Sequence, residues 1–435
     1  MKILKFTSQL LPNWLSELDQ VPDGRLQSRC KYSMKETLFS GIMMFLLRYR
    51  SLRSFTLEHR GNELSLDNFS CFISLSDIPD EDSFRYILES VTTDSVNLIL
   101  KKIHQRLERQ KILDAEKFFG SLDLLSLDGT GQLSSCKVNC EFCLTRNSSD
   151  GRTHFMHGQL LASLTNQSGK YSMPLQFEPI QKDSTQTQYS KNDCELNAAK
   201  RLLQKLRTEF PKRNFCILAD NLLAVDPILS VIESFSWKYI VTAKPDRNKE
   251  VFFMFEYLWE QKQQLERLDS KGHLHRYEWT QNLPLKQYSK TEKQVLTNLV
   301  VYQELSLEGE ILYQSSWVTN LPVDKWNVTL LVSTARARFG IENRNFNEQK
   351  NLGFHIEHNF GHSGNLPNVF FGLAQIAQLF SILFKHWKLG AIDIKRVGSC
   401  RRYFEKLAVV VAELDLGATM KYEMPNYLKF DFDST

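Results

Sequence analysis

The sequence contains no uninterrupted apolar run of membrane-spanning length. Its longest apolar segment, residues 38–47, is shorter than the ~20 residues that a spanning helix requires, and it predicts a buried helix. Residues 1–6 lack the sustained apolar stretch and the small-residue cleavage site of a secretory signal. We therefore expect a cytoplasmic protein.

Neither a disulfide framework nor a strong charge imbalance is expected. Eight cysteines in a cytoplasmic chain favour free thiols or metal ligands, because disulfides persist in oxidising compartments. The formal net charge of +4 permits nucleic-acid binding without requiring it. Basic residues nevertheless gather in two stretches, 101–111 and 385–406. Charge runs are usually solvated faces, but two of them in a chain with the acidic residues described below favour a polyanionic partner.

Helical patterns fill residues 1–115. Ser33 followed by Glu36 is a capping-box signal for the start of a helix that contains the apolar segment. The 42% hydrophobic content of the 435 residues allows a large core and two or three domains. We expect an all-α N-terminal domain over residues 1–115, which leads the chain and contributes to DNA binding.

Strand patterns begin near residue 116. Three predicted strands are followed by a helix, a strand, a helix and a strand, the order of the RNase H-like fold with its mixed sheet covered by helices. These elements lie at 122–127, 155–164, 171–177, 193–206, 215–219, 225–235 and 238–243. We expect an α/β, RNase H-like core over 116–390, with a β-rich insertion at about 245–325, an apolar helix at 369–384 and a basic tail at 391–435. The aromatic residues of the insertion are expected to form its own core rather than to stack on bases.

Three acidic residues follow a pattern suited to a two-metal site. Asp128 and Asp220 each close a short apolar strand signal, and Glu342 lies within a charged helix pattern. Two divalent ions about 3.5–4 Å apart need carboxylate oxygens from several elements, because the ions hold both the attacking and the leaving oxygen. Each acid alone has an ordinary explanation, as a turn residue, a helix cap or a member of an ion-paired helix face. Together they favour a site for Mg²⁺ or Mn²⁺ in which the two strands are parallel neighbours.

Five segments of the chain also share their residue pattern with a known family: 126–130, 193–201, 244–246, 339–343 and 353–362. They resemble, in order, segments of bacterial insertion-sequence transposases of the IS4-like group, which carry a DDE catalytic core. The resemblance runs from about residue 30 to residue 390. It implies an RNase H-like core in which Asp128, Asp220 and Glu342 bind magnesium. It also implies cleavage and strand transfer of the element's own double-stranded DNA ends by a homodimer.

The chain departs from this family at two positions of the last catalytic helix. The family signature places Tyr, Arg, Glu and Lys along that helix; Arg338 matches the Arg, whereas Ala335 and Gln349 stand at the Tyr and Lys positions. At about 100° per residue, Gln349 shares the face of Glu342, and Lys350 is turned about 80° away. We expect Arg338, Lys350 and Lys244 to contact DNA phosphates. The two departures leave a second hypothesis, a non-catalytic or domesticated DNA-binding descendant of such a transposase.

Cys140 and Cys143 have the C-x₂-C spacing that lets two thiolates hold one tetrahedral zinc ion. Two further ligands are required. In the predicted fold, His154 or His157, and Cys194, lie at the same end of the sheet, so they are the expected partners. The sequence equally allows free thiols that line a loop.

Two other groups of residues compete for these roles. Cys136 is an alternative fourth ligand for the zinc ion. His358 and His362 have metal-like spacing if they are helical, but the glycines around them favour a loop. We therefore expect these histidines, with His355, to cap helices or contact phosphate.

Overall fold

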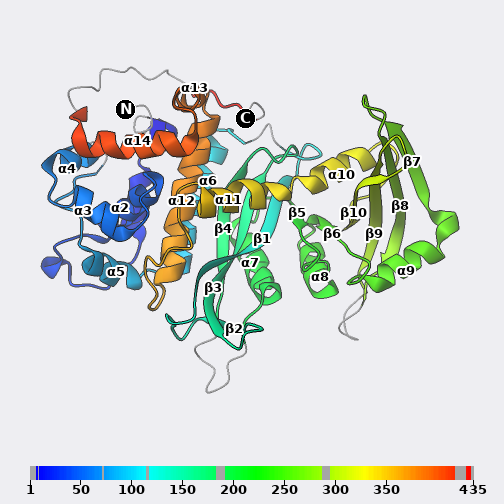
Figure 1. The fold of residues 1–435 in the computed structure, drawn as a ribbon, viewed down its shortest axis with the longest axis horizontal. Helices are drawn as coiled ribbons and strands as arrows, with labels where there is room; N and C mark the ends of the chain where they lie inside the picture. Colours follow the sequence, from blue (N-terminus) through cyan, green and yellow to red (C-terminus); the bar gives the residue numbers. More distant parts are fainter. Residues whose placement is uncertain are drawn as a thin grey trace.

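The computed structural model describes residues 6–7, 9–70, 73–113, 117–182, 192–286, 294–416 and 428–432. These residues form a mixed α/β fold around one ten-stranded sheet. Its strand order is β2-β3-β1-β5-β6-β10-β9-β8-β7, with β4 paired to β3. Helices from the first part of the chain lie beside one end of the sheet, and β7 to β10 form the other end (Figure 1). The boundary expected at residues 115 and 116 lies outside the described residues.

The first part of the chain is helical, as predicted. The Ser33 capping box is present: Glu36 N donates to Ser33 Oγ at 3.1 Å, and Ser33 N donates to Glu36 Oε2 at 2.8 Å. These two bonds satisfy backbone donors that the first helical turn leaves free. The segments are η1 (Trp14–Gln20), η2 (Gln27–Arg29), α2 (Met34–Leu46), α3 (Leu52–His59), α4 (Glu63–Ser70), α5 (Glu81–Glu89) and α6 (Thr93–Arg109).

The central strands alternate with helices in the predicted order. Strand β1 pairs antiparallel with β3 and parallel with β5, and β5 pairs parallel with β6. The elements are β1 (Asp123–Ser135), β2 (Leu144–Asn147), β3 (Thr153–Thr165), β4 (Ser172–Ile180), α7 (Glu195–Glu209), β5 (Phe215–Ala219), α8 (Asp226–Ser234) and β6 (Lys238–Thr242). Two details were not predicted. The short strand β2 is new, and β1 continues beyond Asp128 because its pairing with β3 extends to Ser135.

The β-rich segment extends the central sheet. Strand β10 pairs antiparallel with β6, and β9, β8 and β7 follow outward from it. The elements are α9 (Lys249–Tyr257), η4 (Trp259–Gln261), β7 (Gln263–Leu268), β8 (Leu274–Pro284), β9 (Leu296–Leu305) and β10 (Ile311–Thr319). Trp279 and Trp317 are buried in a hydrophobic cluster with α10, which agrees with the expected core role of the aromatic residues. Phe253, Tyr257 and Trp259 are instead exposed.

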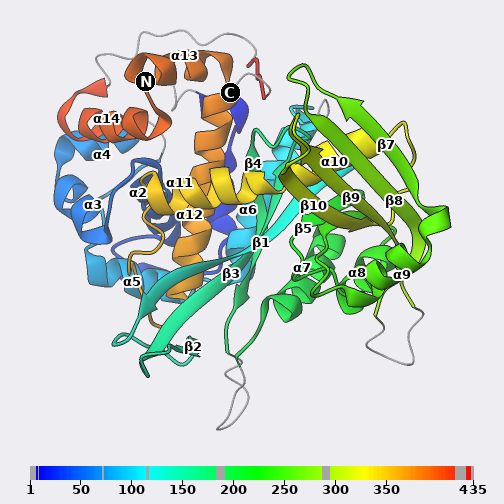
Figure 2. The same cartoon turned by 45° about the vertical axis from the view of Figure 1, so that its right-hand side comes forward.

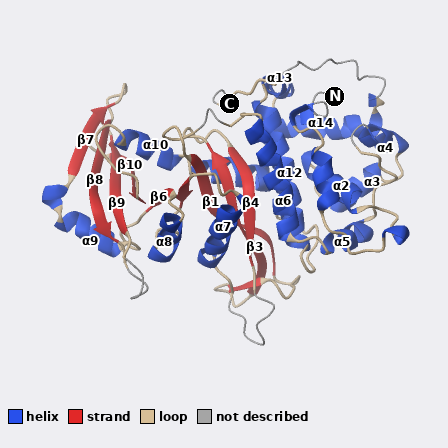
Figure 3. Ribbon diagram, turned by 180° about the vertical axis from the view of Figure 1, so that it is seen from behind, coloured by secondary structure: helices blue, strands red, loops and turns tan. Residues whose placement is uncertain are grey.

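Helices cover both faces of the sheet. Helices α10 and α11 cross one face, and α7 and α8 lie on the other (Figures 1 and 3). A π-helical segment, η5, separates α10 from α11. The remaining elements are α10 (Val328–Arg336), η5 (Ile341–Phe346), α11 (Asn347–Asn351), α12 (Leu366–His386), α13 (Lys388–Val397) and α14 (Cys400–Glu413).

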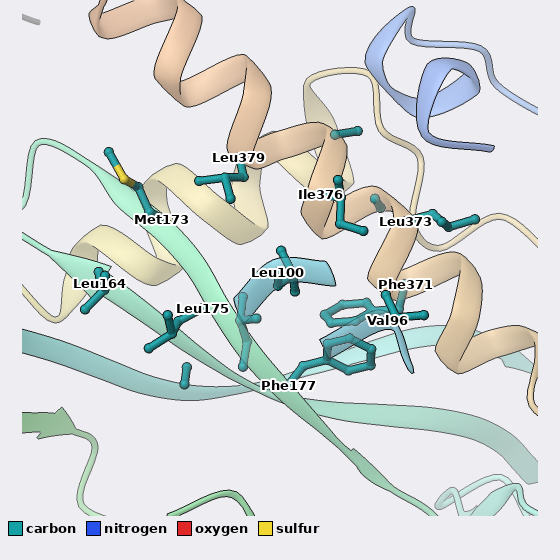
Figure 4. Close-up of a cluster of buried hydrophobic side chains, with 14 of the residues drawn as sticks. Val96, Leu100, Leu164, Met173, Leu175, Phe177, Phe371, Leu373, Ile376 and Leu379 are labelled. Atoms are coloured by element: carbon teal, nitrogen blue, oxygen red, sulfur yellow. The ribbon is translucent and has the colours of Figure 1, made fainter. Parts of the chain in front are cut away.

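Helix α12 is the centre of the main hydrophobic core. Its apolar side chains contact those of α6 and β4, as Phe371 and Phe177 illustrate with ring centroids 5.1 Å apart (Figure 4). The same cluster includes residues from α2 to α6 and from the sheet, so one core joins the helical region to the strands. Within the described residues, α12 is the helix long and apolar enough to cross a membrane, and the apolar window that passes this test is wholly buried in the protein.

Candidate active site and metal centre

Asp128 and Asp220 occupy equivalent positions on two parallel strands. The last pair in the parallel register of β1 and β5 is Ser126 opposite Leu218, and each aspartate lies two residues further along the chain, Asp128 within β1 and Asp220 directly after the end of β5. Residues two apart on a strand point to the same face, so both carboxylates continue the row begun by Ser126 and Leu218. The predicted meeting of the two aspartates agrees with this register. Asp128 lies inside β1 rather than at its end, however, because the pairing with β3 continues.

The face that carries the aspartates is the one covered by α10. Leu124 and Cys216, which precede them by four residues, belong to the hydrophobic cluster that contains Leu331 of α10. The chain then runs from α10 into η5, which carries Glu342 in its first turn. The third acid therefore arrives from the helix that packs on this face.

Two glycines allow the helix to approach the sheet closely. A Cβ added to Gly340 would lie 3.0 Å from the carbonyl oxygen of Gly169, in the loop between β3 and β4. Gly169 itself has a φ of +63°, which side chains rarely adopt. This backbone contact positions the turn that precedes Glu342.

Arg338 links two of the three acids. Its Nη1 atom lies 3.3 Å from Asp128 Oδ2 and 2.7 Å from Glu342 Oε1. The guanidinium side chain is 9% exposed and that of Asp128 is 15% exposed, whereas that of Glu342 is 44% exposed. Arg338 therefore holds a buried and an exposed carboxylate together, with the exposed one accessible to a ligand from solvent.

The surroundings of Asp128 disfavour its charged form. Burial is the main cause that raises the pKa of Asp128, which reaches about 7; Arg338 opposes the rise, and the charges of Glu342 and Asp220 add to it. One positive side chain therefore does not balance the negative charge of this cluster. Carboxylate oxygens from three separate elements are hard donors of the kind that Mg²⁺ and Mn²⁺ bind. Their donor chemistry suits a divalent cation, although the three carboxylates do not place their oxygens all within 4.8 Å of one another.

A fourth acid, Glu195, lies beside the same site and was not predicted as a site residue. It begins α7 on the other face of the sheet, and a Cβ on Gly129 would lie 2.5 Å from Glu195 Oε1. The missing side chain of Gly129 thus makes room for the Glu195 carboxylate. Burial raises the pKa of Glu195, and the negative charge of Asp220 raises it further. The sequence signal was present, since Glu195 lies in the family-like segment 193–201, but only the fold brings it to Gly129.

The basic residues expected at DNA phosphates are dispersed. Lys244 is exposed just beyond β6, where its backbone N–H bonds Asn248 Oδ1. Lys350 Nζ lies 3.1 Å from Glu357 Oε1, so it has an acidic partner away from Arg338. Arg338 is the member of this set that contacts the acid cluster.

Gln349 does not share the surroundings of Glu342, contrary to the helical-face prediction. Its side chain is fully buried and donates to Gln375 Oε1 of α12 at 2.7 Å. Figure 2 shows α11 beside α12. It also contacts Asn345 and Gln378. The prediction assumed α-helical periodicity, but the π-helical segment between Glu342 and Gln349 has more residues per turn. Gln349 therefore faces α12.

Four other side chains converge near the start of β3. Cys140, Cys143, His157 and His362 each offer a ligand atom, and these atoms all lie within 4.8 Å of one another. Burial lowers the pKa of His157 to about 4, with a further contribution from His362, and raises the pKa of the Cys143 thiol to about 11. The fold thus keeps both thiols of the predicted C-x₂-C pair together and adds two imidazoles.

The fourth member of this group is His362 rather than Cys194 or Cys136. Cys194 is exposed at the start of α7 and is not part of the group. Cys136 instead lies 3.6 Å from His154 Nδ1 in an exposed pair. His362 lies in a loop, as expected, and the loop before α12 brings its Nε2 atom to 3.3 Å from Cys143 Sγ. His355 and His358 remain outside the group.

Comparison with known proteins identifies no family for this chain. No model of a known protein family matches the sequence, and no curated protein matches it. The function must therefore be argued from the two clusters themselves.

Proposed function

We propose that the protein is a DNA transposase that cleaves the ends of its own insertion element and joins them to target DNA. The observation that carries the proposal is the convergence of Asp128, Asp220 and Glu342 on one face of the sheet. The strand order β4-β3-β1-β5-β6, with β1 antiparallel to β3 and parallel to β5, supports an RNase H-like core. The resemblance of the acid-bearing segments to IS4-like transposases supplies the substrate, double-stranded DNA.

The chain provides the binding and positioning that phosphoryl transfer requires. Asp128 is fixed on β1, Asp220 directly follows the paired strand β5, and Glu342 is held by Arg338, so three carboxylates are positioned before a substrate arrives. When bound, two divalent ions would activate water or a 3′-hydroxyl and stabilise the charge on the transferring phosphate. Arg338 adds a positive charge beside the reacting phosphate.

A second function, DNA binding without turnover, has one observation in its favour. The lysine position of the family signature is occupied by the buried Gln349, and the adjacent Lys350 is paired with Glu357. No lysine therefore stands at the signature position beside the acids. The retained acids favour the catalytic function, because a binding protein has no need for a cluster of mutually repelling carboxylates.

The test is cleavage of DNA that carries the sequences flanking the gene, with Mg²⁺ present. The parent protein should cut at the element ends. Asp128→Asn, Asp220→Asn and Glu342→Gln preserve shape but remove a metal-binding charge, so each should lower the cleavage rate by about 1000-fold or more.

Binding and folding serve as controls for this test. All three variants should retain DNA binding in a gel-shift assay and a parent-like circular dichroism spectrum. Glu348→Gln, an isosteric change on the same helix but outside the acid cluster, should cut like the parent. If the parent binds the flanking DNA but does not cut it, the non-catalytic function replaces the proposed one.

A further inference from the structure

The Cys/His cluster is assembled from three distant parts of the chain. Cys140 and Cys143 lie in the turn between β1 and β2, His157 lies on β3, and His362 lies in the loop before α12. Cys143 and His362 are 219 residues apart in sequence. A cluster of this kind does not result from local sequence alone, so its geometry requires an explanation.

The distances within the cluster match the edges of a tetrahedron around zinc. With Zn–S near 2.3 Å and Zn–N near 2.1 Å, a tetrahedral site separates two sulfurs by about 3.8 Å and a sulfur from a nitrogen by about 3.6 Å. The Cys140 and Cys143 sulfurs are 3.7 Å apart. His157 Nε2 lies 3.3 Å from Cys140 Sγ and 3.5 Å from Cys143 Sγ, and His362 Nε2 lies 3.3 Å from Cys143 Sγ.

Hydrogen bonding or a disulfide accounts for this arrangement less well. The two sulfurs are far beyond the ~2.05 Å of a disulfide bond. Thiols are weak donors with one hydrogen each, yet Cys143 Sγ has three polar side-chain neighbours, Cys140 Sγ, His157 Nε2 and His362 Nε2. It also accepts from the backbone N–H of Cys140 at 3.4 Å. An ion at the common centre would satisfy all four groups at once.

We propose that Cys140, Cys143, His157 and His362 form a structural zinc site. Four protein ligands close the coordination sphere, which is typical of structural rather than catalytic zinc. Sulfur and imidazole donors favour Zn²⁺, whereas the oxygen donors of the acid cluster favour Mg²⁺ or Mn²⁺, so the two centres are chemically distinct.

The position of the site indicates what the ion stabilises. His157 lies four residues along β3 from Leu161, which pairs with Asp128, so the backbone positions of His157 and Leu161 are about 13 Å apart along the strand. On the other side, His362 anchors the loop between the Glu342 helix and α12. The ion would therefore fix the loop that follows the Glu342 helix against the strand that carries Asp128.

Direct hydrogen bonds at the same seam support this role. Gln132 Nε2 of β1 donates to the carbonyl oxygen of Pro367 at 3.0 Å, and Gln159 Nε2 of β3 donates to Asn368 Oδ1 at 2.7 Å. The proposed zinc site lies at the end of this row of contacts. Metal and hydrogen bonds together join the strands to the start of α12.

The test is metal analysis of the full-length protein, purified without chelator, by mass spectrometry. The parent should contain one zinc per chain, and Cys143→Ser and His362→Ala should each lower this to about a tenth or less. Cys136→Ser removes a neighbouring exposed thiol outside the cluster and should keep the full zinc content. Parent protein without stoichiometric zinc, or Cys143→Ser with unchanged zinc, would overturn the proposal.

Cobalt substitution keeps the test decisive if a variant does not fold. Parent protein exchanged with Co²⁺ should show thiolate-to-cobalt charge transfer and the intense visible bands of tetrahedral coordination. Absence of these bands, or formation of a Cys140–Cys143 disulfide in the parent under reducing purification, would count against the site. Neither readout requires DNA, so its outcome is separate from that of the proposed transposase activity.

Discussion

Asp128 and Asp220 stand in register on neighbouring parallel strands, each two residues beyond the opposed pair Ser126 and Leu218. The equal offset places the two carboxylates on one face, with Asp128 inside β1 and Asp220 directly after the last residue of β5. A site built on paired strands is held more rigidly than one built on flexible segments. This relationship makes the acid cluster a property of the fold.

Arg338 should be important for the stability of the metal-free protein. Arg338→Ala leaves Asp128 and Glu342 without their shared positive partner, so the free energy of unfolding should fall by about 2–4 kcal/mol. Arg336→Ala is the matched control, because Arg336 is exposed and contacts the Tyr313 ring at 4.6 Å. The control should lose about 1 kcal/mol or less in urea denaturation without divalent ions. Equal losses in both variants would contradict this role.

Glu195 should contribute to cation binding without being essential. It adds a carboxylate near Asp220, and burial together with the Asp220 charge raises the pKa of Glu195, so a bound cation would favour its ionised form. Glu195→Gln should therefore raise the Mg²⁺ concentration needed for half-maximal cleavage by about tenfold. Cleavage at saturating Mg²⁺ should stay within about tenfold of the parent rate. An unchanged Mg²⁺ dependence would show that Glu195 lies outside the electrostatic reach of the site.

Replacing Gln349 with the lysine of the family signature should destabilise the protein. The side chain is fully buried among Asn345, Gln375 and Gln378, so Gln349→Lys would place an ammonium group among uncharged amide side chains. We expect a loss of about 3 kcal/mol or more in the free energy of unfolding. Lys350→Ala, next to it, breaks a partly exposed ion pair and should cost about 1 kcal/mol or less. A stable Gln349→Lys protein with faster strand transfer would contradict the buried network.

His104 should make the protein less stable in acid. Burial lowers the pKa of His104 to about 3, and its Nε2 lies 2.7 Å from the carbonyl oxygen of Pro174. Because the unfolded chain binds this proton below pH ~6.5 and the folded chain does not, stability is lost as the pH falls. Between about pH 7 and about pH 5 the loss from this residue should be about 2 kcal/mol.

The variant His104→Gln isolates that contribution. Glutamine can donate to Pro174 but does not titrate, so the variant should lose about 2 kcal/mol less than the parent over the same pH interval. Urea denaturation at both pH values measures the difference. Parallel losses in parent and variant would show that His104 is not the group responsible.

The sequence predicted the parts of the site that depend on local pattern. Short apolar runs located the strands, so β5 has the predicted bounds, Phe215–Ala219, and the order of strands and helices followed. The register that brings Asp128 beside Asp220 was also predictable, because parallel neighbours place equivalent residues on one face. These features require only the chain order and the period of each element.

The positions of the remaining site residues depend on contacts between parts of the chain that are distant in sequence. His362 reaches Cys143 because the loop before α12 folds back onto β3, and no local pattern records this return. Glu195 approaches Asp220 because Gly129 leaves space beside β1. The π-helical segment changed the face on which Gln349 lies, since a periodicity argument assumes a regular α-helix. Such errors arise where tertiary packing overrides local rules.

The central claim is that the acid cluster binds the divalent ions that act on DNA, and exchange of a ligand atom tests it most directly. Asp220→Cys replaces oxygen by sulfur, which Mg²⁺ binds poorly and Mn²⁺ accepts better. Asp220→Ser, with neither a carboxylate nor a thiolate, is the control. The rate to measure is cleavage of DNA carrying the sequences that flank the gene, in each metal. We predict that Asp220→Cys is about 1000-fold slower than the parent in Mg²⁺ and recovers at least about tenfold in Mn²⁺, whereas Asp220→Ser recovers with neither. Parent-like cleavage by Asp220→Cys in Mg²⁺, or identical behaviour of the two variants in both metals, would contradict the claim.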